Sequence, residues 1–187
     1  MSITFPTVLT LARIVMIPVL VLAFYLPYPW SNEVAVAIFI SAGVTDWADG
    51  WIARRYGLTS PFGAFLDPVA DKLIVAVALV LIVQRHPDML LALSAAVIMG
   101  REITISALRE WMAELGQRAR VKVSRVGKSK TVFQMVAIGF LLYGEPLWGL
   151  PVLRIGVVLL VIAAVLTIWS MIIYLRSAWP AIRAGNP

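Results

Sequence analysis

Four aspartates within a short stretch are the residues of this 187-residue sequence whose type and spacing could do chemistry. Asp46, Asp49, Asp67 and Asp71 lie in the segment DWADGWIARRYGLTSPFGAFLDPVADK. At about 100° per residue, the first two share one stripe of a helix and the last two share another. The Ser60–Pro61 pair between them favours chain reversal. We therefore predict a helical hairpin that brings four carboxylates face to face.

Four like charges held together repel one another unless positive charge lies between them. Hard oxygen ligands without histidine or cysteine select Mg²⁺, Mn²⁺ or Ca²⁺ over zinc or copper. A pair of such ions forms a clamp for in-line phosphoryl displacement. We therefore expect two divalent ions, Mg²⁺ or Mn²⁺, with Asp46, Asp49, Asp67 and Asp71 as ligands. Asp71 is also our candidate for the catalytic base that accepts a proton from an attacking hydroxyl.

Two further residues on the first aspartate stripe, and an arginine just beyond them, suit a bulky phosphorylated ligand. Gly50 and Ala53 are small and let a ligand lie against the backbone, and the guanidinium of Arg54 matches phosphate geometry. Plainer interpretations exist for each residue alone. Asp67 before Pro68, for example, would make an ordinary helix N-cap. The joint spacing of all these residues favours the chemical interpretation.

The composition indicates which elements must position these residues. The sequence is 61% hydrophobic and 14% charged, with a mean hydropathy of +0.90 and no cysteine. Soluble domains are roughly 45–50% apolar and about 25% charged, so a water-soluble globular enzyme is excluded. We predict an all-α, polytopic membrane protein with six transmembrane helices around a polar cavity open to the cytoplasm. Its charge-free runs lie at 14–28, 34–45, 73–83, 89–100, 131–144 and 155–175.

Only the run 155–175 is long enough to cross a membrane unaided, and the three shortest runs, 34–45, 73–83 and 89–100, must continue into charged sequence. Extending them predicts helices over 34–55, 68–85 and 88–112. Lys and Arg near span ends stay on the cytoplasmic side, and fourteen of the sixteen basic residues fall on one side when the N-terminus is inside. We therefore expect one multi-pass domain over 1–187 in the cell (inner) membrane, with its active site facing the cytoplasm.

A second group of charged residues lies further along the chain. Glu102 and Arg109 are seven residues apart and so share a helical face. Six basic residues then fall within 118–130: Arg118, Arg120, Lys122, Arg125, Lys128 and Lys130. A polybasic segment on anionic lipid is the alternative for Arg118 and Arg120. The lysines alternate with glycine and hydroxyl-bearing residues, which favours a specific site for a phosphorylated substrate.

The segment from Asp46 to Asp71 fits the pattern DxxDGxxARx8GxxxDxxxD at all eight fixed positions. In this it resembles the CDP-alcohol phosphatidyltransferase family. The resemblance implies attack of an alcohol on CDP-diacylglycerol with loss of CMP, at a dinuclear metal site formed by the four aspartates. It also implies that Asp71 is both metal ligand and base.

The resemblance extends to a first-span motif, PTVLTLAR, with Thr7 where many relatives carry asparagine. It implies that the nucleotide end of the donor is held by residues from this motif and from the aspartate segment. The residues that we expect against CDP-diacylglycerol are Thr10, Arg13, Gly50, Ala53, Arg54 and Ser60.

The stretches REITISALREW and KVSRVGKSKTVFQM are similar to those of family members whose acceptor is sn-glycerol 3-phosphate. This implies phosphatidylglycerol phosphate and CMP as products, with the acceptor phosphate held by Arg101, Arg109, Lys122, Lys128 and Lys130. We expect a bilayer-embedded homodimer without a nucleic-acid partner. The aspartate signature alone leaves another acceptor open, such as inositol phosphate or serine. A transporter is the rival from another class, disfavoured because the acids cluster at one membrane face and no inverted repeat is visible.

Overall fold

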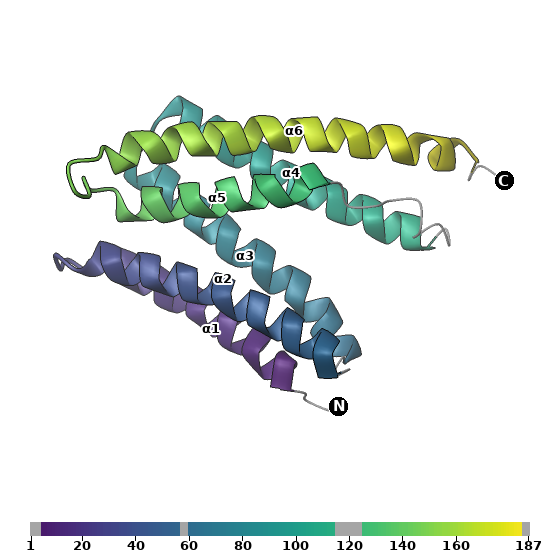
Figure 1. Cartoon of the computed structure of the whole chain (residues 1–187), viewed down its shortest axis with the longest axis horizontal. Helices are drawn as coiled ribbons and strands as arrows, with labels where there is room; N and C mark the ends of the chain where they lie inside the picture. The colour runs from purple at the N-terminus through teal and green to yellow at the C-terminus, as the bar shows by residue number, and fades with distance from the viewer. Residues whose placement is uncertain (1–4, 57–59, 115–124, 185–187) are drawn as a thin grey trace. The chain divides into compact units, whose positions relative to one another are not determined.

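The computed structural model describes residues 5–56, 60–114 and 125–184, and these residues form six helices (Figure 1). The helices are α1 Phe5–Tyr25, α2 Ser31–Tyr56, α3 Pro61–Arg85, α4 Met89–Glu114, α5 Arg125–Tyr143 and α6 Val152–Ala184. The expected all-α class is therefore confirmed. Two helices, α2 and α4, begin and end within three residues of the predicted 34–55 and 88–112.

The start of α3 differs from the prediction, since this helix begins at Pro61 and not at Pro68. Ser60 caps it: the backbone N–H of Gly63 donates to Ser60 Oγ at 3.0 Å. Proline at the first helical position suits such a start because its missing N–H would have no partner there. Asp67 consequently lies inside the helix, so the interpretation of Asp67 as an N-cap is wrong.

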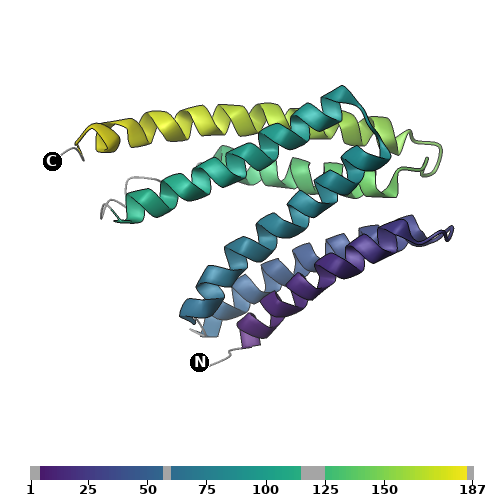
Figure 2. The same cartoon turned by 180° about the vertical axis from the view of Figure 1, so that it is seen from behind.

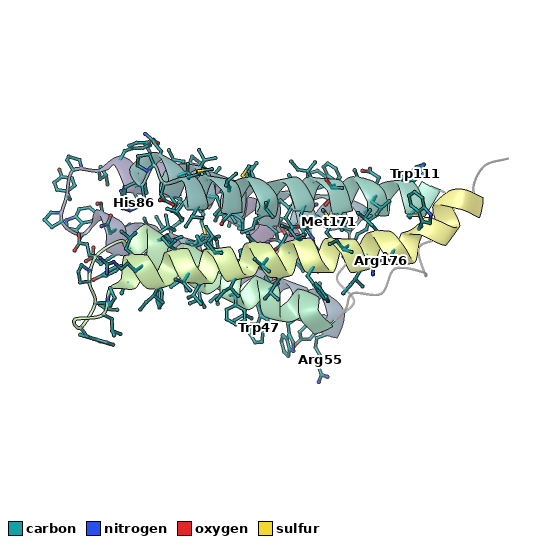
Figure 3. The ribbon with its side chains drawn as sticks, turned by 90° about the horizontal axis from the view of Figure 1, so that it is seen from above. Trp47, Arg55, His86, Trp111, Met171 and Arg176 are labelled. Atoms are coloured by element: carbon teal, nitrogen blue, oxygen red, sulfur yellow. The ribbon has the colours of Figure 1, made fainter. Side chains whose placement is uncertain are left out.

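Apolar surface covers much of the described chain. Three of its helical stretches are long and apolar enough to cross a membrane, namely Phe5–Tyr25, Met89–Met112 and Val152–Arg176. Lys130–Tyr143 is a shorter apolar stretch. Trp47 of α2 is 71% exposed and projects outward, as does Arg55 (Figure 3). Large apolar side chains on the outside of long helices are typical of a protein embedded in lipid.

Two compact units divide the chain, and the first of them, unit 1, comprises 1–85 and 139–153. In this unit α1 packs along α2 and against α3, while α2 and α3 touch each other little. α1 and α2 lie side by side in both views (Figures 1 and 2). The buried face of α1 is polar toward its start and apolar toward its end: Thr7, Thr10 and Arg13, then Ile17, Leu20, Ala23 and Phe24.

Arg85, the last residue of α3, connects the helices of unit 1 near the end of α1, where the buried face of α1 is apolar. Its guanidinium donates to Asn32 Oδ1 at 2.6 Å and to the carbonyl oxygen of Phe24 at 2.9 Å. The same guanidinium lies 3.6 Å from the centroid of the Phe24 ring. Asn32 in turn donates to Glu145 at 3.3 Å. These contacts join all three helices to the segment that follows α5.

The second unit, unit 2, comprises 86–138 and 154–187. Here α4 and α6 pack through an apolar cluster around a tyrosine. Its members are Ile105, Leu108 and Met112 of α4 with Tyr174 of α6, and Met171 packs against them (Figure 3). This cluster fixes the polar end of α4 against α6.

Gly63 lies where α3 closely approaches Thr7 of α1. A Cβ atom at this position would lie 3.0 Å from both Ser60 Oγ and Thr7 Oγ1, whereas one at Gly139 would meet nothing within 4 Å. We predict that Gly63→Ala lowers the free energy of unfolding by about 1–3 kcal/mol through overpacking. Gly139→Ala is the matched control and should raise that free energy by up to about 1 kcal/mol, since alanine favours helix. Thermal unfolding in detergent measures both, and equal shifts would contradict the close approach.

Candidate active site

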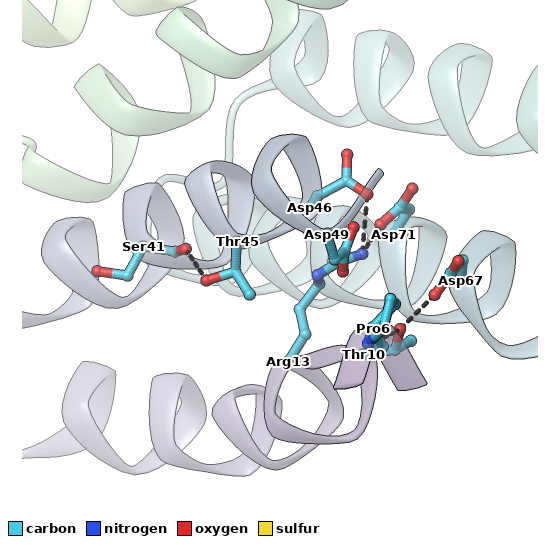
Figure 4. A network of polar contacts seen from close by, with 9 residues as sticks. All are labelled: Pro6, Thr10, Arg13, Ser41, Thr45, Asp46, Asp49, Asp67 and Asp71. Carbon is cyan, nitrogen blue, oxygen red and sulfur yellow. Dashed lines mark hydrogen bonds and ion pairs between the residues drawn. The ribbon is translucent and has the colours of Figure 1, made fainter. Parts of the chain in front are cut away.

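Unit 1 gathers the aspartates of α2 and α3 about one arginine from α1 (Figure 4). Arg13 is 1% exposed and forms ion pairs with Asp46, Asp49 and Asp71. Its Nη1 atom lies 3.0 Å from Asp46 Oδ1 and also pairs with Asp71, while Nη2 pairs with Asp49. The structure thus brings the acids of both helices together, as the hairpin predicts, and it does so through a third helix.

The fourth aspartate, Asp67, is also held from α1. The Thr10 hydroxyl lies within hydrogen-bond reach of the Asp67 carboxylate and of the Pro6 carbonyl oxygen, the latter at 3.1 Å. Its single proton serves one acceptor at a time. Thr7, Thr10 and Arg13 are three residues apart, so a single stripe of α1 meets the acid-bearing helices. We call Asp46, Asp49, Asp67 and Asp71 the acidic cluster.

The acidic cluster carries more negative charge than Arg13 can balance. Asp49 is 3% exposed, whereas Asp46 and Asp71 are partly exposed. Asp49 experiences repulsion from Asp46 and Asp67, and Asp71 from Asp46. Four carboxylates against one guanidinium leave an excess of three negative charges, which is unfavourable where water is partly excluded. Such an excess favours the binding of further cations.

The donor set fits a hard divalent cation in kind, because every potential ligand in the acidic cluster is a carboxylate oxygen. Among the described residues, however, no group of three acidic side chains already surrounds a point where an ion could sit. Arg13 lies among three of the aspartates instead. Binding of a metal ion there would require these carboxylates to turn from Arg13 or to use the oxygen that does not pair with Arg13.

The residues expected against CDP-diacylglycerol lie on α1, on the last turns of α2 and at the start of α3. Gly50 and Ala53 lie on α2 beyond Asp49, and both are half-buried. Arg54 belongs to the same helix, but its side chain lies outside the described residues. Ser60 is buried, and its hydroxyl lies 3.0 Å from Thr7 Oγ1. The structure thus gives Ser60 a role in joining α1 to α3 that the sequence did not indicate.

Unit 2 brings two basic residues onto one carboxylate, with a third basic residue nearby. Glu102 Oε1 accepts hydrogen bonds from Arg101 Nη1 at 2.7 Å and from Lys130 Nζ at 2.9 Å. Lys130 is 3% exposed and experiences the positive charges of both Arg101 and Arg109. We call Arg101, Arg109 and Lys130 the basic cluster. With Glu102 it holds an excess of two positive charges, which suits a phosphate dianion.

Arg109 has a partner that the sequence analysis missed. Its Nε atom donates to the hydroxyl of Tyr174 at 3.0 Å, and its guanidinium carbon lies 5.7 Å from the centroid of the Tyr174 ring. A tyrosine near the end of a long apolar run carries no spacing signal that would have identified it. Of the remaining residues expected at the acceptor, Lys122 lies outside the described residues, and Lys128 lies on α5 with its side chain outside them.

Known proteins resemble this chain over nearly its whole length. The profile of the CDP-alcohol phosphatidyltransferase family matches residues 3–169. Proteins named "CDP-diacylglycerol--glycerol-3-phosphate 3-phosphatidyltransferase" from Shigella flexneri serotype 5b (strain 8401) and Escherichia coli (strain K12) are each 52% identical over 178 residues. One of the same name from Salmonella choleraesuis is 51% identical. Each match covers 95% of this chain and 96% of the relative. With both clusters inside the matched region, this protein belongs to the CDP-alcohol phosphatidyltransferase family.

Proposed function

We propose that this protein transfers the phosphatidyl group from CDP-diacylglycerol to sn-glycerol 3-phosphate, giving phosphatidylglycerol phosphate and CMP in phospholipid biosynthesis. The observation that carries the proposal is the convergence of Asp46, Asp49 and Asp71 on Arg13. The basic cluster supports the acceptor assignment, because its excess positive charge suits a phosphorylated alcohol. The name of the similar bacterial proteins specifies the same donor and acceptor.

The proposed reaction is a direct displacement at phosphorus. The 1-hydroxyl oxygen of glycerol 3-phosphate attacks the β-phosphorus of CDP-diacylglycerol, and the bond from this phosphorus to the CMP oxygen breaks. Asp71 accepts the hydroxyl proton, and CMP carries the bonding electron pair away. Two divalent ions, Mg²⁺ or Mn²⁺, when bound by Asp46, Asp49, Asp67 and Asp71, supply positive charge to the phosphate oxygens.

The donor's nucleotide end is assigned to the residues around the acidic cluster. Gly50 and Ala53 are three apart on α2, so a ligand can approach the backbone of one helix face. Arg54, which carries a positively charged guanidinium, directly follows Ala53 in the sequence. Thr10, Arg13 and Ser60 complete the proposed contacts. The acyl chains of the donor stay in the bilayer.

The acceptor's phosphate is assigned to Arg101, Arg109 and Lys130 together with Lys122 and Lys128. Arginine supports bidentate contacts to phosphate, and lysine acts as a point charge. Lys130 is buried, and its Nζ atom lies 2.9 Å from Glu102 Oε1. The ion pair with Glu102 fixes the position of the Lys130 ammonium group.

We further propose one 1–187 domain with six spans in the inner membrane, a polar cavity open to the cytoplasm, and a homodimeric assembly. The basic residues support this orientation, since all but Arg85 and Arg154 fall on the inner side. The length of α2 and α3, 26 and 25 residues, supports their spanning the bilayer with polar ends.

A panel of acceptor alcohols tests the proposed function most directly. With labelled CDP-diacylglycerol in detergent, we expect CMP release with sn-glycerol 3-phosphate and at most slow release with inositol phosphate or serine. Preference for another alcohol would overturn the acceptor assignment. Absence of CMP release with every alcohol would overturn the chemistry and favour a transporter.

Asp71→Asn tests the base. We predict that CMP release falls by about 10²–10⁴-fold, because the amide cannot accept the hydroxyl proton. Binding of CDP-diacylglycerol should remain near that of the wild type. Asp88→Asn is the matched control, since Asp88 Oδ1 accepts from the backbone N–H groups of Leu90 and Leu91 at 2.8 and 3.1 Å and caps α4. An Asp71→Asn enzyme as active as this control would remove the assignment.

Chelation tests the metal requirement. Exhaustive treatment with EDTA should abolish CMP release, and Mg²⁺ or Mn²⁺ should restore it, because the acidic cluster lacks compensating charge. Zn²⁺ should restore less, since the cluster offers no nitrogen or sulfur ligand. Full activity after metal removal would contradict the proposed ligand role of the aspartates.

A further inference from the structure

We propose that Tyr174 is a positioning residue for the acceptor: its hydroxyl holds Arg109 by Nε and thereby directs both Nη groups of Arg109 toward the acceptor phosphate. This inference rests on the proposed function, in which Arg109 contacts that phosphate. Tyr174 itself need not touch the substrate. The supporting observations are the burial of Tyr174, the atom of Arg109 that it engages, and the charge that it leaves on Arg109.

The Tyr174 hydroxyl is held at a fixed point by apolar packing. Tyr174 is 7% exposed and packs with Ile105, Leu108 and Met112 of α4. Close-packed aromatic rings have little rotational freedom, and their polar ends are accordingly well placed. The hydroxyl thus occupies a fixed position between α4 and α6. It lies beside Arg109, which is one helical turn before Met112 on α4.

Arg109 is itself exposed, so without a partner its long side chain would sample many rotamers. The bond to Tyr174 uses Nε, at 3.0 Å, and the ring lies 5.7 Å from the guanidinium carbon. Both contacts restrain the plane of the guanidinium. The Nη groups, for which no other hydrogen bond is found within the described residues, are left for a ligand. A guanidinium oriented before binding loses less entropy when phosphate arrives.

The partner's lack of charge matters as much as its position. Arg101 and Lys130 share the carboxylate of Glu102, which offsets part of their positive charge. Tyr174 is neutral, so it orients Arg109 and leaves its charge intact for phosphate. An aspartate or glutamate at the same place would orient Arg109 equally well and would compete with the substrate for it.

Tyr174→Phe tests this inference, because phenylalanine keeps the buried ring and removes only the hydroxyl. We expect the KM for glycerol 3-phosphate to rise about tenfold, as for the loss of one hydrogen bond to a charged group. The KM for CDP-diacylglycerol, kcat and the unfolding temperature should stay near wild-type values. Thr167→Val is the matched control: it removes a fully buried hydroxyl, found without a partner in the described chain, from the same helix. It should leave both KM values unchanged.

A second background separates positioning from packing. Arg109→Lys removes the Nε donor, so adding Tyr174→Phe to it should raise the glycerol 3-phosphate KM less than twofold further. A tenfold further rise would overturn the inference, and so would a Tyr174→Phe enzyme that loses affinity for both substrates equally.

Lys130→Ala and Arg109→Ala show whether a failure belongs to Tyr174 or to the proposed function. If they raise the KM for glycerol 3-phosphate while Tyr174→Phe does not, the positioning role is wrong and the acceptor site stands. If neither Lys130→Ala nor Arg109→Ala raises the KM for glycerol 3-phosphate, the proposed acceptor site is wrong, and so is the inference about Tyr174 that rests on it.

Discussion

The ion-paired guanidinium of Arg13 is the interaction on which unit 1 depends. It is 1% exposed and joins carboxylates from two helices that barely touch each other directly. Breaking a buried pair of this kind typically costs about 3–5 kcal/mol, because the partner charge is left uncompensated. The packing of α1 against α2 and α3 is therefore inseparable from the arrangement of the acids. A helix whose buried face is apolar beyond Arg13 thus carries the residue that organises the site.

The acidic and basic clusters are built in the same way, but their net charges have opposite signs. Each contains an ion pair that joins two helices: the buried pair of Arg13 with Asp49 in unit 1, and the partly buried pair of Lys130 with Glu102 in unit 2. Neither cluster is balanced, since the acidic one keeps an excess of negative charge and the basic one an excess of positive charge. Purely structural ion-pair networks tend toward neutrality, because unpaired charge is unfavourable away from water. The residual charges are what make the clusters suited to cations and to a phosphate.

The surroundings of the acidic cluster suit a lipid substrate. α2 presents Asp46 and Asp49 to Arg13, while Trp47 between them is 71% exposed and points outward (Figure 3). One turn of helix thus has a charged face and a lipid-compatible face. A donor with a charged diphosphate and two acyl chains needs both kinds of surface within a short distance, and α2 provides them.

Local patterns in the sequence determined the helical class, the helix bounds of α2 and α4, and the common stripes of the aspartates, because helical periodicity is a short-range property. They could not decide whether α3 starts at Ser60 or at Asp67, since both precede a proline. The tertiary structure decided this through the contact of Ser60 with Thr7, 53 residues away. It likewise decided that Arg13 pairs with the acids and that Tyr174 holds Arg109, 65 residues distant. Such pairings depend on which faces of separate helices meet, and that choice is made by packing between helices and not by the sequence of any one of them.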